Sequence, residues 1–412
     1  MLTIEEAIAR ILSACRTTEV ANVGLHDALG LCLAEDVVAP YGLPEFANSV
    51  MDGYAACAAD LAGASAATEK ALPLIGESRA GATPAALTPG TTMRIFTGAP
   101  IPQGADAVVM QEDVRVANQH VHFKDAPRSL AFVRMQGSDV AQGATVLRAG
   151  AMVHAGEIGL LASLGFSRVP VHKRPRVAIL STGDELRDVE SERRPFTVVN
   201  SNAYALAALV READAEPWVL PRVADDAEAI AEQIRIGLSA DLLLSSGGVS
   251  VGDYDMVQDA YKRAHVSLDF WRVAMKPGKP LMFGKGGADG RTPVLGLPGN
   301  PASAMVTFEL FARPAIRTML GTATPMRPRV LVELTHSHSH AEGRVELARA
   351  SLDLGDPYLR ATLRENQTSG ALSSMVGTDA LVILPAEDKS FQEGQILEAL
   401  MIRPPNSAQF RR

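Results

Sequence analysis

The sequence predicts a multidomain α/β protein with a central doubly wound α/β domain and separate β-rich parts. Three observations support this fold class. From Pro175 to about residue 324, short apolar runs alternate with helical stripes, as in repeated βαβ units. Residues 44 to about 140 hold short strand candidates separated by glycine and proline, which is typical of a mostly β domain. Residues 325 to 402 hold β-like runs with little helical periodicity and predict a small barrel or sandwich.

Composition limits the classes of protein to which this chain can belong. Its 412 residues predict two to four domains, and 47% hydrophobic residues supply the side chains for their cores. A formal net charge of -8 argues against nucleic acid as the main partner, because phosphate backbones are bound by basic surfaces. No uncharged apolar run reaches roughly 18 residues, and Glu5 and Glu6 stand where a secretory leader would be basic. We therefore expect a soluble cytoplasmic protein without a membrane segment.

The cysteines indicate the same compartment. Cys15, Cys32 and Cys57 all lie in the first 57 residues and lack metal-ligand spacing. Reduced, buried thiols of this kind are typical of cytosolic proteins. A zinc site built from them is not expected.

A helix opens the chain. Thr3 and Glu6 have the spacing of a capping box, in which each residue satisfies a free backbone N–H of the other. Apolar side chains from Ile4 to Leu12 then recur on one helical face. This helix therefore has an apolar stripe to bury.

The next segments are mostly β. Met93–Phe96 and Ala107–Met110 are strand candidates within the β-rich part. After it, Ala144–Leu147 predicts a strand and Ile158–Gly165 a short helix.

The central block alternates strands and helices. Asn200 caps one helix, and Asp225 is a good N-cap for the next, although its place after a strand also puts it on the side where ligands bind. The last helix begins at Pro301, and Pro314 predicts a kink or break near Ala312. The strands of this block are predicted at residues 177–180, 218–220, 242–244 and 294–297.

A glycine-rich loop follows the most apolar of these strands. Leu242–Leu244 has no polar alternation, as expected for a parallel strand covered on both faces. Gly247 and Gly248 let the backbone turn sharply and present N–H groups to an anion. The carboxylates of Asp253 and Asp255 follow at once. Amides and carboxylates suit one ligand if a divalent metal bridges the carboxylates to a phosphate-like group.

Two other strand ends and one further loop repeat this design. One strand runs into Ser181–Glu185 and another into Pro298–Pro301. Ligands of open α/β sheets bind outside the carboxyl ends of the strands, so these loops should line one crevice. Between them lies Lys276–Pro280, whose two lysines suit an oxyanion.

Each of these loops also has a purely structural interpretation. A Gly-Gly after a strand is usually a turn, and Asp184 with Glu185 could be the charged start of a helix. Asn300–Pro301 is a good N-cap and N1 pair. Four such loops within about 125 residues are hard to explain as independent turns, which favours a functional crevice.

Isolated polar residues outside the central block are ambiguous. Asp52 and Thr97 sit beside glycines, where side chains are presented to solvent, although an Asx-turn would also explain Asp52 and Asp139. His336, His338 and His340 occupy alternate positions, so they would share one face of a strand and could bind a metal. Solvation is the commoner outcome for such histidines, and no cysteine lies close by in the sequence.

These motifs closely resemble, in order and spacing, the molybdopterin molybdenumtransferase family (MoeA and the E domain of gephyrin). The resemblance is strong from about residue 3 to about 325 and weaker beyond. It rests on Asn48–Ala55, Ser181–Leu186, Ser246–Asp255, Lys276–Pro280 and Leu297–Pro301.

The resemblance implies a four-domain organisation. Domain I would be elongated and discontinuous, comprising residues 1–43 and 141–174, and domain II, residues 44–140, would be β-rich. Domain III, residues 175–324, would be a MogA-like α/β domain that binds molybdopterin. Domain IV, residues 325–412, would be a small β-barrel.

The implied activity is the insertion of molybdenum from molybdate into adenylylated molybdopterin, with Mg²⁺ as cofactor and release of AMP. The implied catalytic residues are Asp52, Asp139, Glu185, Asp225 and Asp255. The implied metal ligands are Asp184, Glu185, Asp225 and Asp255. The implied substrate-binding residues are Thr97, Gly247, Gly248, Ser250, Lys276, Lys279, Pro298, Gly299, Asn300, Ser303, Arg349 and Ser369.

The resemblance also implies partners. It predicts a homodimer whose active site is shared between subunits, and transient contacts with molybdopterin adenylyltransferase and molybdoenzyme chaperones. Nucleic acid and membrane are not expected. Two alternatives stay open: a molybdopterin adenylyltransferase, which lacks the flanking domains, and a non-catalytic scaffold or storage protein of the same fold.

Overall fold

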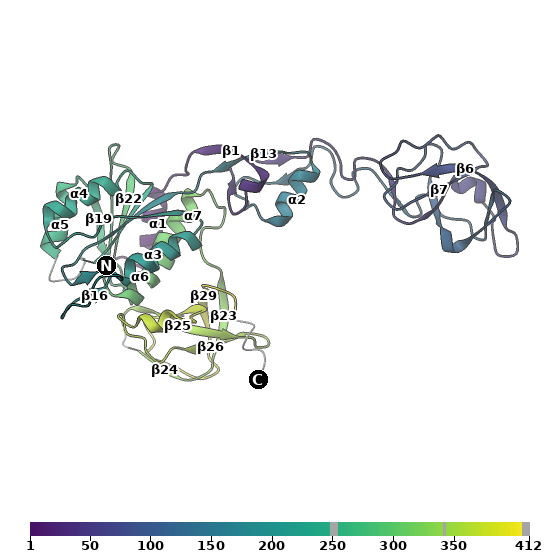
Figure 1. The fold of residues 1–412 in the computed structure, drawn as a ribbon. Coiled ribbons are helices and arrows are strands. Elements are labelled where there is room, and N and C mark those ends of the chain that lie inside the picture. Colours follow the sequence, from purple (N-terminus) through teal and green to yellow (C-terminus); the bar gives the residue numbers. More distant parts are fainter. Residues whose placement is uncertain (248–253, 341–342, 406–412) are drawn as a thin grey trace.

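The computed structural model describes residues 1–247, 254–340 and 343–405. The molecule is elongated, with the β-rich domain at one end and the α/β domain and C-terminal barrel at the other (Figure 1). A narrow unit of short strands and one helix joins the two ends. No helix in the described ranges is long and apolar enough to cross a bilayer.

The β-rich domain is built on a six-stranded sheet in the order β8-β5-β7-β6-β10-β9. Both strands predicted here are confirmed, β8 to the residue. Tyr54, Leu61 and Phe123 form part of its core. The strands of this domain are β4 (Asn48–Ser49), β5 (Gly53–Ala56), β6 (Lys70–Ser78), β7 (Thr92–Ile95), β8 (Ala107–Met110), β9 (Val114–Ala117), β10 (His120–Phe123) and β11 (Val133–Arg134).

The connecting unit joins segments from both sides of the β-rich domain. Its sheet has the order β1-β13-β2, and β3 pairs with β12. Helix α1 (Ile4–Ala14) begins with the predicted capping box at Thr3 and packs against the α/β domain. The other elements are β1 (Val20–Gly24), β2 (Cys32–Leu33), β3 (Val37–Val38), β12 (Thr145–Leu147), α2 (Ala155–Ser163) and β13 (Arg168–His172).

The central domain is a doubly wound sheet, as predicted, and its strands have the order β17-β14-β18-β22-β21-β19. The first four strands are parallel, and β21 and β19 extend the sheet in antiparallel fashion. The strands are β14 (Arg176–Ser181), β15 (Leu186–Arg187), β16 (Val198–Val199), β17 (Glu216–Val219), β18 (Leu242–Ser246), β19 (Ser267–Arg272), β20 (Met275–Lys276), β21 (Pro280–Gly286) and β22 (Thr292–Leu297).

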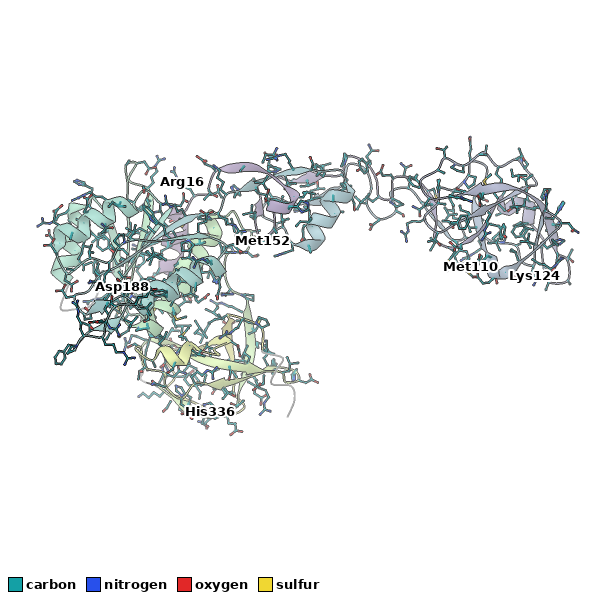
Figure 2. All side chains as sticks on the ribbon, viewed as in Figure 1. Arg16, Met110, Lys124, Met152, Asp188 and His336 are labelled. Carbon is teal, nitrogen blue, oxygen red and sulfur yellow. The ribbon has the colours of Figure 1, made fainter. Side chains whose placement is uncertain are left out.

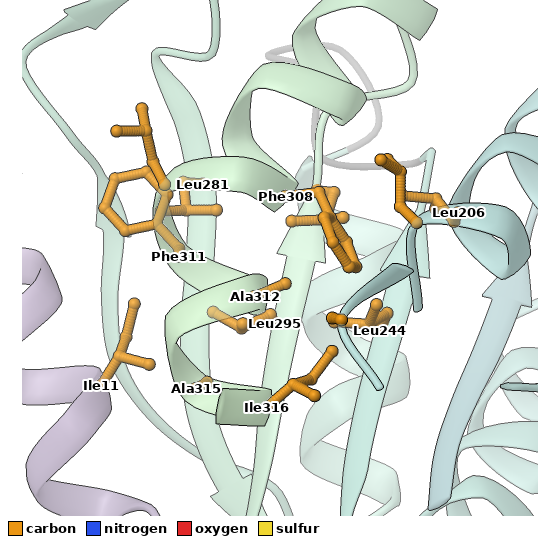
Figure 3. Close-up of a cluster of buried hydrophobic side chains, with 14 of the residues drawn as sticks. Ile11, Leu206, Leu244, Leu281, Leu295, Phe308, Phe311, Ala312, Ala315 and Ile316 are labelled. Atoms are coloured by element: carbon orange, nitrogen blue, oxygen red, sulfur yellow. The ribbon is translucent and has the colours of Figure 1, made fainter. Parts of the chain in front are cut away.

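Helices cover both faces of this sheet. Successive side chains of β18 point to opposite faces of the sheet. Leu242 and Leu244 therefore pack with one set of helices, and Leu243 packs with the other. Helices α1, α3, α6 and α7 cover the first face (Figure 3), and α4 and α5 cover the second. The helices are α3 (Ser201–Glu212), α4 (Ala227–Gly237), α5 (Tyr254–Arg263), α6 (Pro301–Thr307) and α7 (Arg313–Met319).

The last helix of this domain is interrupted where Pro314 predicts a break. A π-helical turn at Phe308–Ala312 separates α6 from α7. The proline ring would collide with the carbonyl four residues earlier in a regular α-helix, and the wider turn relieves this clash.

The C-terminal domain is a small closed β-barrel, as predicted. Its strands follow the order β25-β26-β23-β29-β27, and β27 pairs again with β25. Strand β20 of the α/β domain joins this sheet by pairing with β25. The strands are β23 (Arg329–Leu334), β24 (His338–Ser339), β25 (Val345–Asp353), β26 (Leu359–Leu363), β27 (Ala380–Leu384), β28 (Ser390–Phe391) and β29 (Ile396–Met401).

Candidate active site

Two adjoining cavities lie at the carboxyl ends of β14, β18 and β22, where an open α/β sheet binds its ligands. The larger has a volume of about 520 Å³ and the smaller about 270 Å³. Pro280, Pro298 and Asn300 line both, so the cavities share one wall.

The larger cavity is held in shape by contacts between three loops. Asn202, at the start of α3, donates hydrogen bonds to Ser246 Oγ at 2.7 Å and to the Gly299 carbonyl at 2.8 Å. Gly247 has φ 102°, and a Cβ there would lie 2.6 Å from the Thr182 carbonyl oxygen. Only glycine fits that position, so the close approach of the loops requires the predicted glycine.

Two buried hydroxyls stand at the end of β14. Ser181 Oγ and Thr182 Oγ1 have no hydrogen-bond partner among the described residues. Thr182 lines the larger cavity and is 5% exposed. Unpaired buried polar atoms are uncommon in folded proteins, and at the cavity wall the Thr182 hydroxyl can offer a hydrogen bond to a ligand.

The predicted carboxylates separate into a cavity residue and a pair beside it. Glu185 lines the larger cavity. Asp184 and Asp225 are joined reciprocally, because each backbone N–H faces the other's carboxylate, at N–O distances of 3.4 and 3.1 Å. The described ranges hold no group of three or more His, Cys, Asp or Glu residues arranged to bind a metal. Among the described residues, the candidate ligands for a hard cation beside the Glu185 loop are therefore the carboxylates of Asp184 and Asp225.

The prediction that Asp225 opens the following helix is wrong. Asp226 is the N-cap of α4, and its carboxylate accepts a hydrogen bond from the Ala229 N–H at 2.8 Å. The Asp226 side chain thus accepts a bond from the N–H of the third helical residue, as capping side chains commonly do. Asp225 thus stands outside the helix and faces Asp184.

Part of the glycine loop lies outside the described residues. This applies to Gly248, Ser250 and Asp253, and to the side chain of Asp255 in α5. Their predicted roles stay predictions.

The smaller cavity is lined by three cationic residues. Lys276 and Lys279 come from the predicted lysine loop, and Arg344 comes from the segment before β25. The loop needs its glycine, because a Cβ on Gly278 would lie 2.4 Å from Thr307 Cγ2. Ser303, Thr368 and Ser369 add hydroxyl groups to the same cavity. Cations and hydroxyls together suit an oxyanion.

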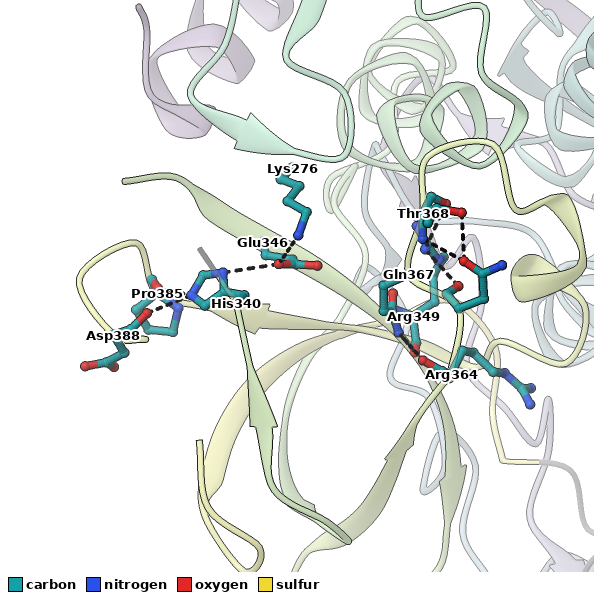
Figure 4. A network of polar contacts seen from close by, with 10 residues as sticks. Lys276, His340, Glu346, Arg349, Arg364, Gln367, Thr368, Pro385 and Asp388 are labelled. Carbon is teal, nitrogen blue, oxygen red and sulfur yellow. Dashed lines mark hydrogen bonds and ion pairs between the residues drawn. The ribbon is translucent and has the colours of Figure 1, made fainter. Parts of the chain in front are cut away.

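Lys276 is not free. Its Nζ lies 2.9 Å from Oε2 of Glu346, whose side chain is 2% exposed, and Glu346 in turn contacts His340 (Figure 4). Lys279 is exposed, and no described residue forms a hydrogen bond or ion pair with its ammonium group. The two predicted lysines are therefore held differently.

Arg349 is fully buried behind the smaller cavity. Its Nη2 donates to the Asn366 and Thr368 carbonyls at 3.2 Å, whereas Nε and Nη1 have no partner among the described residues. Burial lowers the pKa of Arg349, and the negative charge of Glu346 partly opposes this. Arg349 is not among the lining residues and supports the loop that carries Ser369.

Asn300 connects that loop to the α/β domain. It occupies the predicted N-cap position of α6, but its side chain makes no capping bond. Its Nδ2 instead donates to Ser369 Oγ at 2.9 Å, and the Ser303 N–H donates to the Ser369 carbonyl at 3.3 Å. The barrel and the α/β domain thus meet at predicted site residues.

Asp52 and Thr97 form a second, distant group. The Asp52 carboxylate accepts hydrogen bonds from the Thr97 N–H at 2.7 Å and from Thr97 Oγ1 at 2.8 Å. These bonds, the backbone one first, lower the pKa of Asp52. Met110, which pairs with the residue after Asp52, lies at the opposite end of the molecule from Asp188, which follows the Glu185 loop (Figure 2).

Asp139 belongs to neither group. It lines a separate cavity of about 580 Å³ with Pro44, Arg134 and Ser138, at the junction of the connecting unit and the β-rich domain. Within one chain, the structure therefore does not bring Asp52, Thr97 or Asp139 to the cavities of the α/β domain.

Sequence reasoning missed several residues of these cavities. Arg344 has no motif around it, and only its position before the strand that carries Arg349 could have indicated it. Asn200 was visible as a helix-capping residue, although it lines the larger cavity, as does Asn202. The contacts of Glu346 with the lysine loop and of His340 with Glu346 gave no signal, because they depend on the barrel's position, and His340 was considered only as a possible metal ligand.

Comparison with known proteins places the whole chain in one family. Family models match residues 2–165 (MoeA N-terminal region, domain I and II), 178–318 (probable molybdopterin binding domain) and 332–402 (MoeA C-terminal region, domain IV). The chain is 38% identical over 384 residues to a molybdopterin molybdenumtransferase of Nostoc sp., covering 92% of this chain and 88% of that protein. It is 40% identical over 356 residues to molybdopterin molybdenumtransferase 2 of Mycobacterium tuberculosis, covering 85% and 86%.

A solved structure agrees along the full length. The crystal structure of the molybdopterin biosynthesis MoeA protein from Pyrococcus horikoshii OT3 matches with a TM-score of 0.85 and 27% identity, covering 97% of this chain and 100% of that one. The chain therefore belongs to the molybdopterin molybdenumtransferase family, a family of transferases in molybdenum cofactor biosynthesis.

Proposed function

We propose that this chain transfers molybdenum from molybdate to adenylylated molybdopterin and releases AMP, in a reaction that depends on Mg²⁺. The observation that carries the proposal is the pair of adjoining cavities, one rich in neutral hydrogen-bonding groups and the other in cations. An organic substrate and an inorganic oxyanion would then meet at the shared wall of Pro280, Pro298 and Asn300.

The larger cavity suits the organic substrate. Its volume lies in the range of small-molecule sites, and its lining offers hydroxyls, amides and backbone groups. Ser201 and Asn202 stand at the amino-terminal end of α3, whose free N–H groups favour an anionic group such as a pyrophosphate. The unpaired hydroxyl of Thr182 offers a further hydrogen bond.

The smaller cavity suits molybdate. The ammonium groups of Lys276 and Lys279 and the guanidinium of Arg344 offset the two negative charges of the ion. The hydroxyl groups of Ser303 and Ser369 can orient its oxygens. The bound oxyanion is then held next to the substrate, and this proximity lowers the entropic part of the barrier.

Asp184 and Asp225 fit the needs of Mg²⁺. This cation is usually held by one or two carboxylates together with substrate phosphates and water. When bound, it supplies positive charge that polarises the phosphoanhydride of the substrate. The two carboxylates would hold it beside the Glu185 loop, and the lysine loop would bind the oxyanion on the other side of the shared wall.

The distant Asp52–Thr97 pair supports a shared active site. We propose that the β-rich domain of one subunit completes the cavities of the other in a two-fold dimer. Exposed apolar side chains of the β-rich domain fit such a contact, because exposed apolar surface often marks interfaces. They include Val50 and Met51, which precede Asp52, and Phe132, whose carbonyl accepts a hydrogen bond from the Val50 N–H. Phe46 and Leu130 are also exposed.

The decisive experiment is reconstitution with purified components. The protein is incubated with adenylylated molybdopterin, sodium molybdate and Mg²⁺, and AMP and transferable molybdenum cofactor are measured. We expect both products in equal amounts, and neither without molybdate. Binding of both ligands without AMP would favour a scaffold, and consumption of ATP with unmodified molybdopterin would favour an adenylyltransferase.

A further inference from the structure

The lysine loop is attached to the C-terminal barrel by backbone and side-chain contacts at the same residue. Strand β20 pairs in parallel with β25, and Lys276 lies opposite Glu346 in the register. The same two residues form an ion pair with an Nζ–Oε2 distance of 2.9 Å. The barrel thus holds the first lysine of the loop, whereas Lys279 is exposed.

Glu346 is itself fixed from behind. Its side chain is 2% exposed, and His340, which is 1% exposed, places Nδ1 3.2 Å from the same Oε2. His340 Nε2 lies 2.8 Å from the Asp388 carbonyl oxygen and 3.2 Å from that of Pro385. Since Nε2 faces only acceptors, it carries a proton, and the imidazole cannot rotate without losing these bonds.

The ammonium group of Lys276 has a side left for a ligand. Its side chain is 39% exposed and lines the smaller cavity. An ammonium group has three N–H donors, of which Glu346 engages one. The four-carbon stem of Lys276 is flexible and would otherwise allow the ammonium group many positions. The buried carboxylate of Glu346 selects one of them.

We propose that Glu346 is a positioning residue, which with His340 holds the Lys276 ammonium where it can bind the oxyanion. This inference rests on the proposed function of the smaller cavity as the molybdate site. It gives the C-terminal barrel a part in binding, because the acceptor that sets the position of Lys276 lies on β25. Glu346 acts through Lys276 and does not line the cavity itself.

The test is a double-mutant cycle on molybdate affinity, measured by calorimetry on the full chain. Lys276→Met and Glu346→Leu should each weaken binding on the order of tenfold, the loss expected for one oriented charged donor. In the Lys276→Met background, Glu346→Leu should have no further effect, since the group it positions is gone. Additive losses would overturn the proposal.

Conservative variants separate position from charge. Glu346→Gln keeps an oxygen that can accept from Lys276 and from His340 Nδ1 but removes the charge, and should bind molybdate within about threefold of the wild type. Glu346→Asp keeps the charge but withdraws the carboxylate by one methylene, and should bind several-fold more weakly. An aspartate variant that binds as well as the glutamine variant would contradict a positioning role. If Glu346→Leu does not fold, the comparison of Glu346→Gln with Glu346→Asp still tests whether Glu346 positions Lys276.

Two controls keep the result interpretable. Glu398 pairs with Arg329 at 2.9 Å on the exposed side of the barrel, so Glu398→Leu should leave molybdate affinity unchanged. Affinity for the organic substrate should also stay constant in the Glu346 variants, whereas general misfolding would lower both affinities. If neither Lys276→Met nor Lys279→Ala changes molybdate affinity, the proposed site itself fails. If only the cycle fails, Glu346 has no positioning role.

Discussion

The carboxylate of Asp52 accepts two hydrogen bonds from Thr97, one from the backbone N–H at 2.7 Å and one from Oγ1 at 2.8 Å. Both bonds end on the same oxygen, Oδ1, so Oδ2 is not engaged by Thr97. Both residues are exposed in the β-rich domain, which lies at the opposite end of the molecule from the α/β domain (Figure 1). An oriented carboxylate that does not line the α/β cavities of its own chain fits the proposed shared site.

The hydrogen bonds from Thr97 predict the acid titration of Asp52. Its pKa is lowered in the folded state, so the pair stabilises the fold above the unfolded pKa of about 3.9, and this contribution is lost as pH falls through the lowered folded pKa. Thr97→Val removes the Oγ1 bond and should raise the pKa of Asp52, whereas Thr97→Ser should preserve it. NMR titration of the Asp52 carboxyl group measures this. Identical titrations for the valine variant and the wild type would refute the prediction.

Mixing two inactive variants should restore activity if the cleft is shared. Asp52→Ala and Lys279→Ala should each be nearly inactive alone. After joint unfolding and refolding, about half of the dimers are mixed, and each mixed dimer has one intact site and one doubly defective site. Activity should therefore recover to roughly a quarter of the wild-type value. No recovery despite proven subunit exchange would place the whole site within one chain.

The Asp184–Asp225 pair predicts a requirement for a divalent cation. EDTA should abolish AMP release, and excess Mg²⁺ should restore it, because carboxylates facing a pyrophosphate need a cation between them. Asp184→Asn and Asp225→Asn should each raise the Mg²⁺ concentration for half-maximal activity by about tenfold or more, as loss of one charged ligand implies.

The neighbouring Asp226→Asn is the matched control for this pair. Asparagine still caps α4, so the Mg²⁺ requirement should stay as in the wild type. Full activity of the wild type in chelator would exclude the metal.

Lys279 should contribute charge and little stability. It is exposed in a loop that Gly278 and the prolines shape, so Lys279→Ala should lower the melting temperature by less than about 2 °C. Molybdate affinity should fall about tenfold, since one charged donor is lost. Lys285→Ala, an exposed lysine on β21, should change neither quantity. A large fall in melting temperature for Lys279→Ala would indicate a structural role.

The sequence by itself determined the features that depend on neighbouring residues. The capping box of Thr3 and Glu6, the apolar strand at Leu242 and the break caused by Pro314 all appear in the structure. Each is a local effect of side-chain size, hydrogen bonding or backbone geometry within a few residues. Each loop at the end of a parallel strand directly follows that strand in the sequence. Because the carboxyl ends of the parallel strands in a doubly wound sheet lie at one edge, the sequence also predicted that these loops would lie together.

Tertiary structure decided which side chains meet. Lys276 and Glu346 are 70 residues apart in sequence, and their contact exists because β20 joins the barrel sheet. The burial of Arg349 and the separation of Asp52 from Lys279 likewise follow from how whole domains are placed. Even the N-cap of α4 is Asp226 and not the expected Asp225, since only the path of the chain into α4 fixes which carboxylate reaches the helix. Such pairings depend on contacts between distant segments, for which local sequence patterns carry no signal.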